Sequence, residues 1–116
     1  MPDILATAHT LVEAVFSKPH ITELTKYEAS GTKLHFKYDS DGYLSIHYIE
    51  LREDLRNQKL FCTFEYFIED NSHIHKVTGI RVRNIHNLKF AEALVNRGYF
   101  RANFSDSFLP TLEKEF

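Results

Sequence analysis

The sequence predicts an α/β (α+β) domain with a mixed, mostly antiparallel central sheet and helices on both faces. Two patterns carry this prediction. Asp41-Gly42, a strong hairpin signal, lies between two segments with strand-like patterns. A strand, a helix and a further strand then follow one another over residues 43–84, as in a βαβ crossover. The chain has 116 residues, 43% of them hydrophobic, so we expect one domain over 1–116 with a single core.

Composition and charge exclude several classes of protein. The formal net charge is −2, with acidic and basic residues interspersed, which gives no broad electrostatic reason to bind nucleic acid or an anionic membrane. The single cysteine, Cys62, cannot form an intramolecular disulfide, so we expect a reducing, cytoplasmic location and a thiol that fills the core. Residues 4–16 contain only short apolar runs, so neither a signal peptide nor a membrane span is predicted there.

The first predicted element is an amphipathic helix over residues 4–16. Its apolar residues recur at helical spacing, and Pro2 and Asp3 suit a helix start. Lys18 precedes Pro19, and the residue before a proline is pushed out of helical geometry, so the helix should end there.

Strands are predicted next. Residues 21–30 are ambiguous, but residues 32–39 alternate between apolar and polar side chains, as in a half-buried strand. The hairpin at Asp41-Gly42 should pair this strand antiparallel with 43–51. The second strand is apolar on both faces, as expected near a sheet centre with layers on both sides: Leu44, Ile46 and Tyr48 on one face, and Tyr43, Ile49 and Leu51 on the other.

The second half of the chain predicts two further helices and two strands. One helix reaches Asp70 and carries an apolar stripe of Leu60, Phe61, Phe64, Phe67 and Ile68. A strand over 77–84 and a short helix over 87–97, ended by Gly98, should follow. Residues 99–105 suggest a last strand, and 106–116 have no assigned structure.

This order of elements resembles the GNAT superfamily of N-acetyltransferases, over roughly residues 32–104. Two spacings carry the resemblance: Leu51-x-x-x-Leu55-Arg56-x-x-x-Leu60 and Asn87-x7-Val95-x2-Gly98-Tyr99. The resemblance implies a GNAT-like fold and the use of acetyl-CoA to acetylate an amine. It covers none of the family's first strand, which favours a binding module or a homo-oligomer that completes the sheet.

In that family, backbone N–H groups of the loop before the helix bind the coenzyme A pyrophosphate, because a helix N-terminus offers unpaired donors and a positive dipole end. Here Lys59 and Phe61 stand at the two positions where the family's loop has glycine-like residues. Their side chains hinder the close approach of a phosphate to the backbone. The alternative is that residues 52–61 are only the charged, solvated start of the helix. The resemblance implies these cofactor-binding residues: Leu51, Arg56, Asn57, Gln58, Lys59, Leu60, Phe61 and Asn87.

The resemblance also suggests catalytic groups. Glu50, on the central strand, is the candidate base, although it could equally be a surface carboxylate paired with Arg52. The position of the family's proton-donating tyrosine falls on Leu94, which cannot donate a proton. Tyr48, the candidate acid, or Tyr99 could take its place, although Tyr99 too could be a core or interface tyrosine. A core or interface tyrosine is the alternative for Tyr48. Regular alternation places His47 and Glu50 on opposite faces.

The histidines raise a metal hypothesis. His73 and His75 form a His-x-His pair, which on a strand could point two imidazoles toward one metal ion. No third ligand is fixed by spacing, so we expect surface or turn histidines and no metal site.

Two classes of function follow from the sequence. The first is a small acetyl-CoA-dependent N-acetyltransferase with an acceptor amine. The second is a catalytically inactive GNAT-like module that contacts a protein partner. Binding of acetyl-CoA would discriminate between them.

Overall fold

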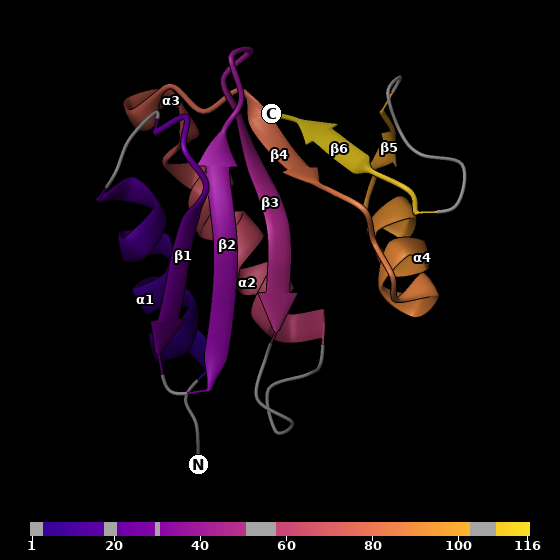
Figure 1. Ribbon diagram of the computed structural model, residues 1–116, viewed down its shortest axis with the longest axis horizontal. Helices are drawn as coiled ribbons and strands as arrows, with labels where there is room; N and C mark the ends of the chain where they lie inside the picture. Colours follow the sequence, from indigo (N-terminus) through magenta and orange to yellow (C-terminus); the bar gives the residue numbers. More distant parts are fainter. Residues whose placement is uncertain (1–3, 18–20, 30, 51–57, 103–108) are drawn as a thin grey trace.

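The computed structural model describes residues 4–17, 21–29, 31–50, 58–102 and 109–116. Its helices and strands follow one another along the chain as α1 (Ile4–Phe16), β1 (Thr25–Ala29), β2 (Thr32–Tyr38), β3 (Tyr43–Glu50), α2 (Gln58–Asp70), α3 (Ser72–His75), β4 (Gly79–Val82), α4 (Leu88–Asn96), β5 (Phe100–Arg101) and β6 (Leu112–Glu115) (Figure 1).

The strands form one six-stranded sheet in the order β1-β2-β3-β4-β6-β5. Every neighbouring pair is antiparallel except β3 and β4, which are parallel, so the predicted mixed, mostly antiparallel sheet is confirmed. The ambiguous segment 21–30 contributes β1. The unassigned end of the chain contributes β6, which inserts between β4 and β5 and supplies a pairing that no local pattern indicated.

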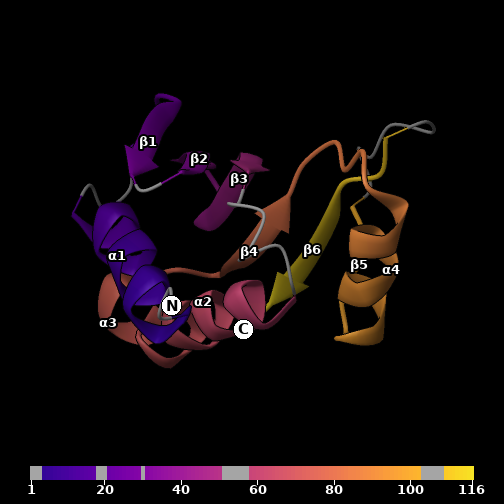
Figure 2. The same cartoon turned by 90° about the horizontal axis from the view of Figure 1, so that it is seen from below.

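Helices α1, α2 and α4 lie side by side on one face of the sheet, whereas the sequence predicted helices on both faces (Figure 2). The ring centroids of His9 and Phe67 lie 4.2 Å apart between α1 and α2, and those of Phe61 and Phe90 lie 5.1 Å apart between α2 and α4. The crossovers β3-α2-β4 and β4-α4-β5 proceed across the sheet in the same direction, so right-handed connections place both helices on the same face.

The core lies between this helical layer and the sheet. Phe64 and Ile68 of α2 are fully buried, as the predicted stripe requires, whereas Phe67 is only partly buried at the contact with α1. The sheet contributes its alternate residues, namely Leu34, Phe36, Tyr38, Leu44, Ile46, Ile80, Val82 and Leu112. The opposite face of β2 and β3, which no described helix covers, carries mainly polar side chains and is called the open face below.

A β-bulge interrupts β3. Ile46 lies opposite Phe36 and Tyr48 lies opposite His35, so His47 is an extra residue without a partner in this register. Beyond the bulge the alternation is reversed, because one inserted residue moves each following side chain to the other face. The prediction that Tyr48 shares the face of Ile46 is therefore wrong: Tyr48 lies across from His35 on the open face and is 44% exposed.

Candidate active site

The parallel strands β3 and β4 separate halfway along their length. Their pairing runs from Tyr43 opposite Gly79 to Ile46 opposite Val82, and its last hydrogen bond joins the N–H of Arg83 to the carbonyl of Ile46 at 2.9 Å. Within the described residues, no strand pairs with β3 on this side beyond Ile46. The backbone groups of the second half of β3 therefore line an open edge.

Asn84 explains why β4 leaves its neighbour. Its φ is 49°, in the left-handed region, which asparagine adopts more readily than most residues. After this turn the chain follows β6 instead of β3. The Asn84 N–H donates to the Thr111 hydroxyl at 3.2 Å, and the Ile85 N–H donates to the Pro110 carbonyl at 2.9 Å.

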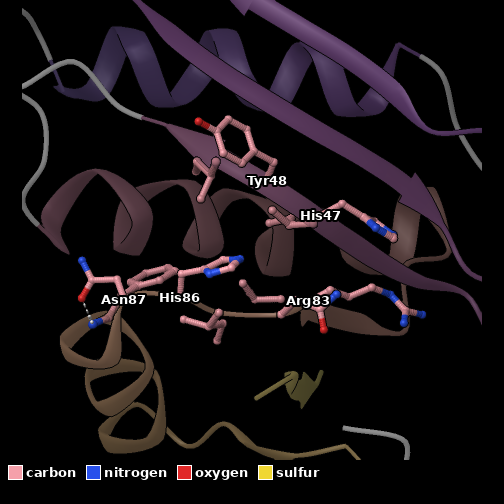
Figure 3. Close-up of a pocket in the computed structure, with 11 residues that line it drawn as sticks. His47, Tyr48, Arg83, His86 and Asn87 are labelled. Atoms are coloured by element: carbon pink, nitrogen blue, oxygen red, sulfur yellow. Dashed lines mark hydrogen bonds between the residues drawn. The ribbon is translucent and has the colours of Figure 1, made fainter. Parts of the chain in front are cut away.

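A cavity of about 170 Å³ lies between the separated strands (Figure 3). Its apolar lining comes from Ile46, Ile49, Val82, Ile85 and Phe90, and its polar lining from His47, Tyr48, Arg83, Asn84, His86 and Asn87. A cavity beside an unpaired strand edge can bind an extended chain through backbone hydrogen bonds.

Asn87 was predicted as a cofactor-binding residue, and it lies in the cavity lining. Its side-chain oxygen is also the N-cap of α4, where it accepts hydrogen bonds from the N–H groups of Lys89 at 3.0 Å and Phe90 at 3.2 Å. The side-chain amide nitrogen is then the part of Asn87 that can serve a ligand.

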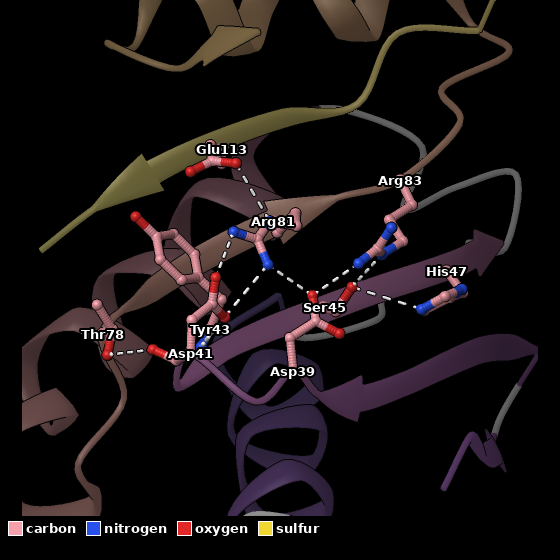
Figure 4. A network of polar contacts seen from close by, with 9 residues as sticks. All are labelled: Asp39, Asp41, Tyr43, Ser45, His47, Thr78, Arg81, Arg83 and Glu113. Carbon is pink, nitrogen blue, oxygen red and sulfur yellow. Dashed lines mark hydrogen bonds and ion pairs between the residues drawn. The ribbon is translucent and has the colours of Figure 1, made fainter. Parts of the chain in front are cut away.

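A buried arginine holds the hairpin turn against the sheet on the open face (Figure 4). Arg81 is 4% exposed and donates to three carboxylates: to Asp39 at 2.6 Å, to Asp41 at 2.8 Å and to Glu113 at 3.2 Å. Its guanidinium carbon also lies 4.2 Å from the centre of the Tyr43 ring. The Arg81 hydrogen bond is the main cause of the lowered pKa of Asp41.

Arg83 extends this network toward the cavity. It donates to Asp39 at 2.8 Å and through its Nε to the Ser45 hydroxyl at 2.7 Å. The Ser45 hydroxyl lies 3.4 Å from Nε2 of His47. Burial alone would raise the pKa of Asp39, but hydrogen bonds from Arg81 and Arg83 outweigh it and lower that pKa.

Of the two predicted catalytic residues, Tyr48 lies in the cavity lining and Glu50 does not. The Glu50 carboxylate forms an ion pair with Lys33 at 3.8 Å, with both side chains more than 40% exposed. Such an exposed pair holds the carboxylate only weakly. The base role of Glu50 remains a prediction.

The predicted pyrophosphate loop is described only in part. Leu51, Arg56 and Asn57 lie outside the described residues. Gln58 and Lys59 begin α2, and their backbone alone is described. Leu60 and Phe61 are 1% and 3% exposed, so their side chains belong to the core. A ligand at this helix end could accept hydrogen bonds from the backbone N–H groups of the first turn.

Sequence reasoning missed His86 and Arg83. His86 is exposed, and Figure 3 shows its ring between α4 and β3. Neither residue belongs to a recognisable motif. A weak signal was available in the polar run from Arg83 to Asn87, broken only by Ile85, because polar residues directly after a strand often line a site.

A second buried charge cluster lies between α2 and the end of α4, away from the cavity. Glu65 is 1% exposed and accepts hydrogen bonds from Arg97 and from Lys114, the latter at 3.3 Å. Arg97 also donates to the half-buried Cys62 sulfur. Burial, reinforced by the charge of the neighbouring Glu65, raises the pKa of Tyr99. These contacts indicate a structural role.

His73 and His75 lie on α3, a single helical turn, and not on a strand. The His75 ring stacks on Phe16 with centroids 3.9 Å apart. Among the residues that the structure describes, no three His, Cys, Asp or Glu side chains gather as a metal-binding group. None of the described helices is long and apolar enough to cross a membrane.

Comparisons with known proteins agree with this architecture. No protein-family model and no curated protein sequence matches the chain. A crystal structure from Agrobacterium tumefaciens, described as a "putative acetyltransferase", superposes with a TM-score of 0.57 at 14% sequence identity. The match covers 100% of this chain and 95% of that one. Similarity at this identity establishes the fold and leaves the reaction open. The chain therefore shares the overall fold of that structure, and its mixed, mostly antiparallel sheet is consistent with the GNAT-like fold that the sequence predicted.

Proposed function

We propose that the chain is a small N-acyltransferase that moves an acetyl group from acetyl-CoA to an amine in the cavity between β3 and β4. The separation of these two strands carries the proposal. It opens the sheet beside an unpaired edge of β3 and leaves a cavity there that is lined by both apolar and polar side chains.

The cavity suits the thioester arm of coenzyme A. Its volume of about 170 Å³ is smaller than that of pockets for drug-sized molecules, which measure about 300–1,000 Å³. A narrow chain that carries amide groups fits better, because it can add to the open edge of β3 as a strand would. The N-terminus of α2, which follows β3 in the chain, is then the proposed site of the pyrophosphate.

The reaction requires one bond to form and one to break. The amine nitrogen attacks the thioester carbonyl carbon, the C–S bond breaks, the amine loses a proton and the departing thiolate gains one. The bulge at His47 interrupts the β2–β3 ladder beside the cavity, which supports a role for its backbone N–H groups in holding the carbonyl oxygen. Tyr48 is the proposed acid, and Glu50 the proposed base.

Thermal unfolding with acetyl-CoA tests the proposal. A ligand that binds only the folded state at a hundred times its Kd stabilises it by about 2.7 kcal/mol. For a domain of this size that corresponds to a rise in Tm of about 10 °C. No rise at millimolar acetyl-CoA would overturn the proposal.

Two matched variants locate the site. His86→Trp adds bulk to the cavity lining at an exposed position, so it should reduce the rise in Tm. His73→Trp makes the same change on α3, outside the lining, and should preserve the rise. An equal response from the two variants would place the ligand elsewhere.

The alternative is a GNAT-like module that contacts a protein partner. Exposed apolar side chains at the β5 edge favour it: Leu88 and Val95, seven residues apart on α4, are 72% and 53% exposed, and Phe100 of β5 is 53% exposed. This alternative predicts no response to acetyl-CoA. It also predicts that replacing Leu88 and Val95 with serine weakens partner binding and leaves the Tm unchanged.

A further inference from the structure

We infer that the acceptor amine carries a carboxylate, and that Lys37, His47 and Arg83 bind this group on the open face beside the cavity. The inference rests on the proposed function and names the class of acceptor. It follows from the distribution of donors and charges around the cavity.

The cavity lining contains donors of positive or neutral charge and no described carboxylate. Its polar side chains are those of His47, Tyr48, Arg83, Asn84, His86 and Asn87. A cationic acceptor such as a polyamine needs acidic residues to bind its additional ammonium groups, whereas an anionic acceptor needs N–H donors. The N–H donors that line the cavity therefore match an anionic acceptor.

Three neighbouring strands bring these donors together. Lys37 of β2 lies opposite Ser45 of β3, and His47 follows two residues later at the bulge. Arg83 donates to the same Ser45 hydroxyl, from the end of β4. Lys37 is half-buried and forms no ion pair with another described residue, so its ammonium group can bind an anion.

The hydrogen bonds also assign a donor to His47. The guanidinium of Arg83 can only donate, so the Ser45 oxygen accepts at that contact. Ser45 is fully buried, and its own proton is best placed toward Nε2 of His47. The proton of a neutral His47 then lies on Nδ1, which leaves an N–H donor for a ligand.

The local potential agrees with an anion site. Burial is the first cause of the lowered pKa of His47, and the positive charges of Arg83 and Lys37 are the next. The charge of Asp39 raises the pKa of His47, although this carboxylate forms ion pairs with Arg81 and Arg83. His35 lowers the pKa of His47 further. A bound carboxylate would offset these positive charges and raise the pKa of His47.

Paired acceptors test the inference by activity. Glycine and glycinamide share the amine and differ in the carboxylate, so kcat/KM for acetyl transfer should be at least about tenfold higher for glycine. Lys37→Glu should abolish this preference. Lys26→Glu makes the same charge change on the exposed edge strand β1 and should keep it. Equal or better use of glycinamide by the unmodified chain would overturn the inference.

Binding of the product class provides a readout that needs no turnover. N-acetylglycine should raise the pKa of His47, followed by NMR of its imidazole, and N-acetylglycinamide should not. Lys37→Glu should remove the response. An unchanged pKa with saturating N-acetylglycine would overturn the inference even if acetyl transfer occurs. A raised pKa without any acetyl transfer would support the anion site and overturn the proposed reaction alone.

Discussion

At the scale of single residues, Arg81 joins parts of the chain that are far apart in sequence. It connects the turn between β2 and β3, through Asp39 and Asp41, to Glu113 on β6. Its own pKa is raised by these carboxylates despite the opposing effect of burial, so the side chain stays charged. Removing this partner leaves the carboxylates of Asp39 and Glu113, which are 11% and 12% exposed, without a compensating charge.

Arg81→Met should therefore lower the free energy of unfolding by about 3–5 kcal/mol, the usual cost of breaking a buried ion pair from one side. Lys33→Met is the matched control, because its pair with Glu50 is exposed and should contribute about 0–1 kcal/mol. Urea denaturation of both variants measures the difference. Similar midpoints for the two would show that the Arg81 network contributes no more than a surface pair.

Glu50→Gln tests the predicted base at the same scale. If Glu50 accepts the proton, acetyl transfer should fall on the order of a hundredfold or more, because that is the usual effect of removing a general base. The fold should survive, since the carboxylate is exposed and contacts only Lys33 among the described partners. Steady-state kinetics with a fixed acceptor measure the change, and unchanged turnover would remove Glu50 from the mechanism.

At the scale of elements, Asn84 determines where β4 leaves β3. Asn84→Val should lower the free energy of unfolding by about 1–2 kcal/mol, because a β-branched residue fits the left-handed region poorly. Asn84→Gly keeps that backbone accessible and should cost less. Thermal denaturation compares the two. Equal losses would show that the Asn84 side chain, and not its backbone conformation, supports the turn.

Helix α2 offers a matched pair of phenylalanines. Phe64 is fully buried against the sheet, and Phe64→Ala should cost about 3–5 kcal/mol. Phe67 is partly exposed and stacks on His9, so Phe67→Ala should cost less. The sequence placed both residues on one apolar stripe that should cover the sheet. A denaturation midpoint that falls more for Phe67→Ala would mean that the contact with α1 dominates.

At the scale of the whole molecule, local patterns predicted the elements better than their long-range arrangement. The hairpin at Asp41-Gly42 was readable because its turn chemistry is local, and Gly42 has the expected positive φ of 86°. The strand β6, with the sequence Leu-Glu-Lys-Glu, has little intrinsic preference for a strand and exists through its pairing with β4 and β5.

The candidate site was harder to predict for the same reason. The cavity depends on the bulge at His47 and on the left-handed turn at Asn84, and each is a single-residue departure from a regular pattern. Arg83 and His86 become neighbours of β3 only after the sheet has formed. The resemblance pointed to β3 and to the helix that follows it, while the side chains that line the cavity could be named only from the tertiary structure.

The whole molecule should lose stability in acid through the carboxylates that Arg81 and Arg83 hold. The pKa of Asp39 and that of Asp41 are lower in the folded chain than in the unfolded chain, where an aspartate titrates near about 3.9. Their stabilisation is therefore complete above that value and disappears as the pH falls through the lower folded values. The Asp39 side chain is 11% exposed and that of Asp41 49%, so Asp39 should contribute more.

Urea denaturation of the unmodified chain and of Asp39→Asn should give a clear difference in unfolding free energy at pH 7, and that difference should shrink below about pH 4. A difference that stays constant down to pH 2 would show that the charge of Asp39 does not stabilise the fold.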